Sequence, residues 1–282
     1  MARFKFEICR VESLEELTHY INSDWVKNHI FVQSQELLDW QHKNTEENCY
    51  NFILAREIKT GELCGILGYI FSSHFSSVLK ENKDVWLAIW KFKEGAKYAG
   101  LGLKLLSYLK RKYKVKTICS IGLSKMVLPM YKALNFNTGQ LKQFILINDK
   151  CVSNNILSKG CWQPSIIKPN TDYSLVKLTL EQLRSIPDSI LEQVFVTQPE
   201  KNCEYIENRF FQHPIYRYDI YSVNFNREVK GILVTRLIEK EGSKVLRIID
   251  YQGDPTHLSH LNLQLTNLLE IHNCEYIDFM QY

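Results

Sequence analysis

Short apolar runs and helix-like patterns alternate along the first half of the chain. The apolar runs are bounded by turn residues and predict strands, with a tight hairpin turn at residues 59–62. The predicted strands cover residues 4–11, 50–57, 63–71, 84–90, 116–123 and 141–147. Helical spacing predicts helices at 14–22, near 37–40, at 101–112 and at 127–134. Ser13 and Glu16 have the spacing of a capping box at the start of the first helix.

The second half repeats part of this order. Strands are predicted at 174–178, 218–223, 228–233, 245–251 and 276–280, with a helix at 179–184. The hairpin at 218–233 parallels the one at 50–67, and 205–209 parallels 37–40. This similarity predicts an internal duplication. Chance likeness between generic hairpins is the alternative.

Mixed helices and strands predict an α/β fold with helices on both faces of each sheet. We expect a first unit at 1–150, a connection at 151–171 and a second unit at 172–282. The connection contains Pro164 and Pro169. The second unit is expected to be incomplete, because the chain stops soon after the strand at 276–280 and leaves out a further helix and strand.

The turn Lys97-Tyr98-Ala99-Gly100-Leu101-Gly102 joins the strand at 84–90 to the helix at 101–112. Glycine lets the backbone approach a ligand closely, and a helix N-terminus presents unpaired N–H groups. Together these features predict an anion site suited to a phosphate or pyrophosphate. The corresponding turn of the second half contains Asp254 and Pro255, a negative charge and a missing donor. We expect that turn not to bind the same anion.

Composition limits the function classes. The chain has 282 residues and a net charge of +4, which argues against a dedicated nucleic-acid binder. Its eight cysteines form no CxxC pair, and no His cluster has zinc spacing, so no metal is expected. The N-terminus lacks the apolar core of a signal peptide, and no apolar run is long enough to span a bilayer. We expect reduced cysteines, a cytoplasmic location and no membrane partner.

The anion turn is followed by Met130-Tyr131-Lys132-Ala133-Leu134-Asn135-Phe136. In this order, on this strand–helix pattern, the two motifs resemble those of the GNAT superfamily of acyl-CoA-dependent N-acyltransferases. In the family, the anion turn begins with Arg or Gln, which is followed by two residues of any type, a Gly, one further residue, and then Gly or Ala. The later motif has a Tyr a few residues before a Gly-Phe pair. This chain departs from both motifs, with Lys97 at the first position and Asn135 at the later glycine. The resemblance implies two GNAT-like units, each a mixed, mostly antiparallel sheet flanked by helices.

The resemblance also implies a site that binds acetyl-CoA or another acyl-CoA. The pyrophosphate is expected on backbone N–H groups of the turn, the pantetheine arm along the end of the preceding strand, and Ser124 beside that arm. The implied binding residues are Trp90, Lys91, Phe92, Lys97, Tyr98, Ala99, Gly100, Leu101, Gly102 and Ser124.

Catalytic roles follow from the same resemblance. Tyr131 is expected to protonate the leaving thiolate; a half-buried aromatic role on its helix is the alternative. His74 and Asp84 flank the strand at 84–90 and are candidate general bases, although a surface or loop-capping role suits each as well. Trp40 is a candidate for the acceptor site, against a core role.

The implied function is transfer of an acyl group, expected to be acetyl, from the thioester to the amine of a small acceptor. Tandem GNAT-like proteins of bacterial surface-polysaccharide synthesis, which this chain resembles, use an amino group on a nucleotide-linked sugar. A tRNA-dependent aminoacyl transferase and a noncatalytic binding or scaffold protein are the alternatives. The expected partner is a small-molecule amine, without nucleic acid; the oligomeric state is open.

Overall fold

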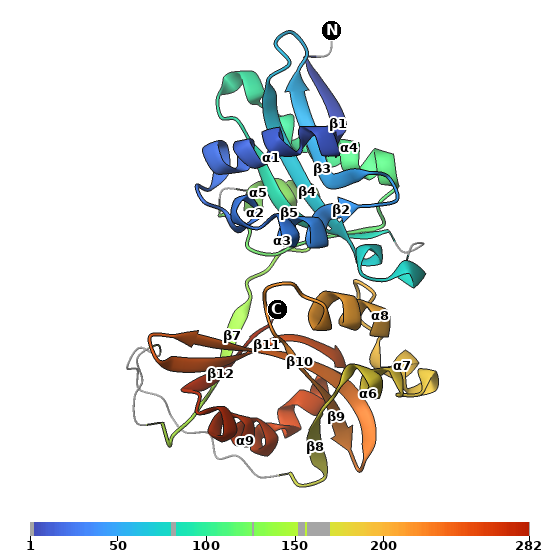
Figure 1. Ribbon diagram of the computed structural model, residues 1–282, viewed down its shortest axis with the longest axis vertical. Helices are drawn as coiled ribbons and strands as arrows, with labels where there is room; N and C mark the ends of the chain where they lie inside the picture. Colours follow the sequence, from blue (N-terminus) through green and yellow to red (C-terminus); the bar gives the residue numbers. More distant parts are fainter. Residues whose placement is uncertain (1–2, 80–82, 126, 152–155, 157–169, 282) are drawn as a thin grey trace. The chain divides into compact units, whose positions relative to one another are not determined.

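The computed structural model describes residues 3–79, 83–125, 127–151, 156 and 170–281. It divides into two compact units (Figure 1). The first unit comprises Met1–Leu123, Pro199–Asn208 and His213–Ile215. The second comprises Ser124–Gln198, Arg209–Gln212 and Tyr216–Tyr282. Among the described residues, no helix is both long and apolar enough to cross a bilayer.

The sheet of the first unit has the strand order β1-β3-β4-β5-β6, and β2 adds to β3. Neighbouring strands are antiparallel except β5 and β6, which are parallel and joined by α4. The strands are β1 (Phe4–Arg10), β2 (Lys43–Asn44), β3 (Cys49–Glu57), β4 (Leu63–Phe71), β5 (Asp84–Phe92) and β6 (Thr117–Ser120).

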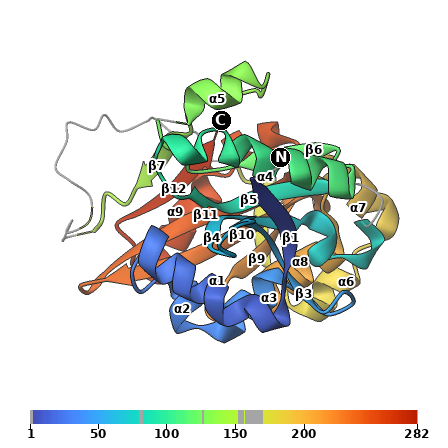
Figure 2. The same ribbon diagram turned by 90° about the horizontal axis from the view of Figure 1, so that it is seen from above.

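Helices cover both faces of this sheet. Figure 2 shows α1, α2 and α3 on one side of the strands and α4 on the other. The helices are α1 (Leu14–Tyr20), α2 (Ile30–Gln33), α3 (Gln35–His42) and α4 (Leu101–Tyr113). The apolar stripe of α4 is buried as its spacing predicts, at Leu101, Leu105, Leu106 and Leu109.

The capping box at Ser13 and Glu16 was a wrong prediction. Ser13 makes no side-chain cap bond, because a 3₁₀ turn (Val11–Ser13) leads into α1 and holds Ser13 at φ −94°, ψ 5°. A side-chain cap requires an extended residue at that position. Ser34 meets this condition at α3, where its hydroxyl accepts from the Leu37 N–H.

The sheet of the second unit has the order β7-β12-β11-β10-β9-β8. Its last five strands repeat the first sheet: β8 to β11 are antiparallel, and α9 (Asn262–His272) joins β11 to a parallel β12. The strands are β7 (Lys142–Ile147), β8 (Tyr173–Lys177), β9 (Asp219–Phe225), β10 (Glu228–Lys240), β11 (Ser243–Gly253) and β12 (Tyr276–Gln281).

The second sheet includes a strand that precedes the unit's own first strand in the chain. The strand predicted at 141–147 to close the first unit is β7, and it pairs with β12 in the second sheet. Leu146 packs against the second core, and the Gln143 side chain donates to Asp278. The free edge of β12 thus receives the strand. Much of the connection expected at 151–171 lies outside the described residues.

Other helices of the chain are short. They are α5 (Leu128–Ala133), α6 (Leu180–Arg184), α7 (Asp188–Val194) and α8 (Cys203–Ile206). Although α8 follows α7 in sequence, it belongs to the first unit. The sequence patterns predicted α6 and the region of α8 but missed α7 and α9.

The turn after β11 differs from the turn after β5. The Asp254 carboxylate accepts from the Thr256 N–H at 2.9 Å and from its hydroxyl at 2.7 Å. These bonds hold the pKa of Asp254 below its usual value. The chain's own carboxylate thus occupies one backbone donor of this turn, and the expectation that the turn does not bind the same anion stays a prediction.

Candidate acyl-CoA site

The end of β5 has one unpaired edge. Pairing between β5 and β6 runs from Asp84 opposite Thr117 to Leu87 opposite Ser120 and stops there, while β5 continues to Phe92. Its other edge stays paired to β4 as far as Phe92. Among the described residues of the first unit, no strand pairs with the outer edge of 88–92. Backbone donors and acceptors there are available to an extended ligand.

A bulge coincides with the point where the two strands part. Leu67 of β4 lies opposite Trp90, and Tyr69 lies opposite Leu87. Gly68 therefore faces two residues of β5, Ala88 and Ile89. A bulge of this kind bends the strand that carries the extra residue. The bend explains why β5 leaves β6 at Leu87.

The turn between β5 and α4 forms a compact backbone loop. A 3₁₀ helix (Ala96–Tyr98) uses the N–H groups of Tyr98 and Ala99, which donate to Gly95 and Ala96 carbonyls. Gly100 then adopts a left-handed conformation, φ +74°, as the N-cap of α4. The first N–H groups of a helix have no partner within it. The backbone N–H groups available to a ligand are therefore those from Gly100 onward. The sequence had also predicted those of Tyr98 and Ala99, which are used within the 3₁₀ helix.

Two glycines make room for Phe92 beside this loop. A Cβ on Gly102 would lie 2.7 Å from the Phe92 ring, and one on Gly65 would lie 2.9 Å from the Phe92 Cβ. In contrast, a Cβ on Gly100 would meet no atom within 4 Å. Gly100 is required for its backbone conformation and borders open space, whereas Gly102 is required for close packing between α4 and β5.

Lys97 and Tyr98 form one contact within the loop. The Lys97 ammonium lies 4.7 Å from the centre of the Tyr98 ring, and its hydrogen bond with Tyr98 raises the pKa of the lysine. Tyr98 is buried, with its ring 6.2 Å from that of Phe4. Lys97 is therefore a cation held at the loop, while the Tyr98 side chain belongs to the core.

Trp40 and His74 lie in an aromatic cluster of the first unit. The Trp40 indole N–H donates to the Asn208 carbonyl at 3.3 Å, and its ring lies 4.3 Å from His213 and 5.1 Å from Phe75. His74 Nε2 donates to the Trp40 carbonyl at 2.8 Å. These contacts suit a packing role for both side chains. Their acceptor-site and general-base roles stay predictions.

Asp84 begins β5, in the part that is paired with β6. Its side chain is buried, and one carboxylate oxygen accepts from the Glu200 N–H at 3.2 Å. Asp84 lies four positions before Ala88, about 13 Å along the strand. The loop-capping alternative fits this position, and the base role is left as a prediction.

Ser124 and Tyr131 belong to the second unit, so their roles toward the first-unit loop stay predictions. Tyr131 lies on α5, is 3% exposed and packs edge-on against Phe136 at 5.0 Å. Asn135 has φ +59°, which is the left-handed conformation that glycine supplies in the family motif.

No known family model matches this chain, and no curated protein matches it in sequence. Solved structures do match its fold. One is a GCN5-related N-acetyltransferase of Anabaena variabilis ATCC 29413, with a TM-score of 0.59 and 10% identity over 99% of this chain and 66% of that chain. The chain has the GNAT fold.

Two further structures agree on this fold. A conserved protein of unknown function from Enterococcus faecalis V583 matches with a TM-score of 0.56 and 8% identity, over 99% of this chain and 65% of that chain. A GCN5-related N-acetyltransferase of Sphaerobacter thermophilus matches with a TM-score of 0.50 and 9% identity, over 100% of this chain and 87% of that chain. This chain spans less than two thirds of the Anabaena and Enterococcus chains.

Proposed function

We propose that this chain is an acyl-CoA-dependent N-acyltransferase. One observation carries the proposal: the unpaired edge of β5 at 88–92 leads directly to the Gly100 turn and the free N–H groups of α4. An acyl-CoA has an amide-bearing arm joined to a pyrophosphate. The strand edge suits the arm, and the helix N-terminus suits the pyrophosphate.

The residues of the first unit fit such a co-substrate. Gly100 borders open space, so a pyrophosphate can approach its backbone without a Cβ between them. Lys97 adds a positive charge at the same turn. Trp90, Lys91 and Phe92 provide the backbone groups for the pantetheine arm. The described residues include no cluster of three or more side chains that could hold a metal ion.

When bound, the co-substrate supplies an activated acyl carbon, which the acceptor amine attacks while the carbon–sulfur bond breaks. We assign the backbone N–H groups at the Ala88–Ile89 bulge to stabilise the developing oxyanion. Tyr131 is the proposed proton donor to the departing thiolate. The bound amine loses one proton, to His74, Asp84 or solvent.

We further propose that the acceptor is a small amine, an amino group on a nucleotide-linked sugar, and that the protein acts in the cytoplasm as part of polysaccharide synthesis. The support for this acceptor is the resemblance to tandem GNAT-like proteins. A screen of UDP- and dTDP-linked amino sugars against charged tRNA tests it. Transfer to charged tRNA instead would favour the aminoacyl-transferase alternative.

Calorimetry with acetyl-CoA tests the site itself. Gly100→Asp places a negative charge at the turn and should weaken binding by at least about tenfold. Gly100→Asn is the matched control, because Asn has the same shape without the charge and tolerates left-handed geometry. It should bind within about threefold of the unchanged protein. Equal binding by both variants would move the site elsewhere.

Tyr131→Phe tests the proton donor separately. We expect normal acetyl-CoA binding and slower turnover, because general acid catalysis contributes about 100-fold or more. Unchanged turnover would remove Tyr131 from the mechanism. A protein that binds no acyl-CoA at all would favour the noncatalytic alternative.

A further inference from the structure

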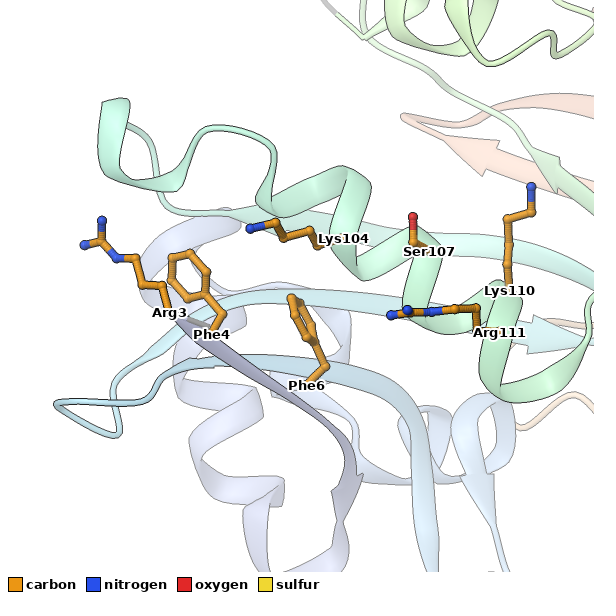
Figure 3. Close-up of a pocket in the computed structure, with 7 residues that line it drawn as sticks. All are labelled: Arg3, Phe4, Phe6, Lys104, Ser107, Lys110 and Arg111. Atoms are coloured by element: carbon orange, nitrogen blue, oxygen red, sulfur yellow. The ribbon is translucent and has the colours of Figure 1, made fainter. Parts of the chain in front are cut away.

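A groove runs beside α4 on the face of the first sheet. The helix packs mainly on β3, β4 and β5, and β1 extends the sheet one strand further. The space between them is a cavity of about 670 Å³ (Figure 3). Its lining residues are Arg3, Phe4, Phe6, Lys104, Ser107, Lys110 and Arg111.

The floor of this β1–α4 groove is apolar and recessed. Phe4 is 8% exposed, and the ring of the partly buried Phe6 stacks on Tyr108 of α4 at 5.8 Å. Figure 3 shows both phenylalanines rising from β1 beside the helix. Alternate residues of a strand share one face, so both rings lie on the same face of the sheet as α4. The floor can receive apolar side chains from an occupant.

The wall formed by α4 is strongly basic. Lys104, Lys110 and Arg111 are exposed, and none of their side chains has an ion-pair or hydrogen-bond partner among the residues that the structure describes. Arg3, at the end of β1, is paired with Glu57 at 2.9 Å. Three cations are thus uncompensated along about two turns of helix, a length of about 10 Å. This charge pattern is complementary to an acidic occupant.

The opposite wall is an open strand edge. β1 is the last strand of its sheet, and no described strand pairs with its outer edge. A bulge between Ile8 and Cys9 limits the regular stretch to Phe4–Ile8. An extended segment added there would place alternate side chains over the two phenylalanines. Acidic side chains on that same face would reach the basic wall, and the side chains between them would point to the other face of the sheet.

We propose that the β1–α4 groove binds an extended acidic segment of another protein, which adds as a strand to β1. The strand edge supplies main-chain hydrogen bonds, the phenylalanine floor receives apolar side chains, and the three cations select acidic ones. This surface lies on the β1 side of the sheet, three strands away from β5 in the strand order.

Three other occupants fit less well. A second copy of this chain, paired edge to edge about a two-fold axis, would bring the same three cations against each other. A lipid surface needs apolar side chains that project outward, whereas Phe4 is nearly covered. Nucleic acid would use the cations but leave the strand edge without partners.

A short capped peptide in which Leu and Glu take turns at every second position, with Ser between them, is the test probe, and the same peptide with Lys in place of Glu is its negative control. We expect the acidic peptide to bind in a salt-dependent way. Lys104→Glu with Arg111→Glu should weaken it about tenfold. Lys112→Glu with Lys114→Glu reverses two charges at the C-terminal end of α4 that do not line the groove, and should change binding by less than about twofold. Thermal unfolding confirms that each variant folds.

Amide hydrogen exchange then locates the peptide. Slower exchange within Phe4–Ile8 on addition of the acidic peptide is the expected result. Four results would overturn the proposal: absence of binding, equal loss in the two double variants, no protection of β1, or tighter binding of a single-stranded RNA than of the peptide. Displacement of the peptide by acetyl-CoA would likewise assign the groove to the acyl-CoA site.

Discussion

Two glycines of one turn have different physical tasks. Gly100 has φ +74° and open space where a side chain would begin, so only its backbone conformation is constrained. Gly102 has ordinary helical geometry, but a Cβ there would lie 2.7 Å from the Phe92 ring. The family-like spacing of these glycines therefore combines one ligand-facing position with one packing position.

Gly102→Ala should destabilise the first unit by about 1–3 kcal/mol, because overpacking forces α4 or Phe92 to move. Urea unfolding measures the loss. Gly102→Ala combined with Phe92→Leu should recover part of it, since the smaller side chain makes room for the new methyl group. A single variant as stable as the unchanged protein would show that Gly102 is not a packing position.

At the scale of elements, α3 is fastened to β3 by a carboxylate. The hydroxyl of Tyr50 donates to Asp39 at 2.6 Å, and Lys43 donates at 3.0 Å. Burial by itself would raise the pKa of Asp39, but the hydrogen bonds from Tyr50, Lys43 and Gln35 lower it below its usual value. A carboxyl group with a lowered pKa in the fold stabilises the protein above its unfolded-state pKa. That contribution is lost as pH falls through the folded-state value.

Tyr50→Phe should lower the free energy of unfolding by about 1–2 kcal/mol at neutral pH. The difference should shrink as pH falls below about 4. Tyr113→Phe is the control, because its hydroxyl bonds at 2.7 Å to the hydroxyl of Tyr69 and not to a carboxylate. Its effect should be constant across the same acidic range. A constant effect for Tyr50→Phe would exclude the linkage to Asp39.

The sequence predicted most strands and the α4 turn because their signals are local: apolar alternation, helical spacing and glycine position. It failed where the decisive interaction is distant. Ser13 has the right neighbours for a cap but the wrong backbone angles. The β1–α4 groove joins Phe4 and Phe6 to residues a hundred positions later, so no local pattern reveals it. The unpaired edge of β5 after Leu87 depends on where β6 ends, and the spacing of apolar residues does not predict that end.

At the scale of the whole molecule, the two units repeat one strand order but differ in their anion turns. In the turn after β5, the first N–H groups of α4 have no partner within the helix. In the turn after β11, the Thr256 N–H already donates to the Asp254 carboxylate. The strand β7 precedes the second unit's own first strand and still completes the second sheet at β12. The sequence placed this strand in the first unit because strand pairing does not follow order along the chain.

Leu146→Asp should loosen the β7–β12 edge, because Leu146 packs against the second core. Amide exchange should become faster in β12 and stay unchanged in β3 of the first sheet. Phe144→Asp is the control on the same strand, since Phe144 is 55% exposed. Faster exchange in β3 with an unchanged β12 would contradict the assignment of β7 to the second sheet.

The central claim is that the β5 edge and the Gly100 turn hold an acyl-CoA. Amide hydrogen exchange with and without acetyl-CoA tests it most directly, because it reports on the backbone groups in question. We expect slower exchange at Gly100, Leu101 and Gly102 and along 88–92, with no change at the turn around Asp254. Protection at the second turn, or binding that leaves the Gly100 turn unchanged, would contradict it.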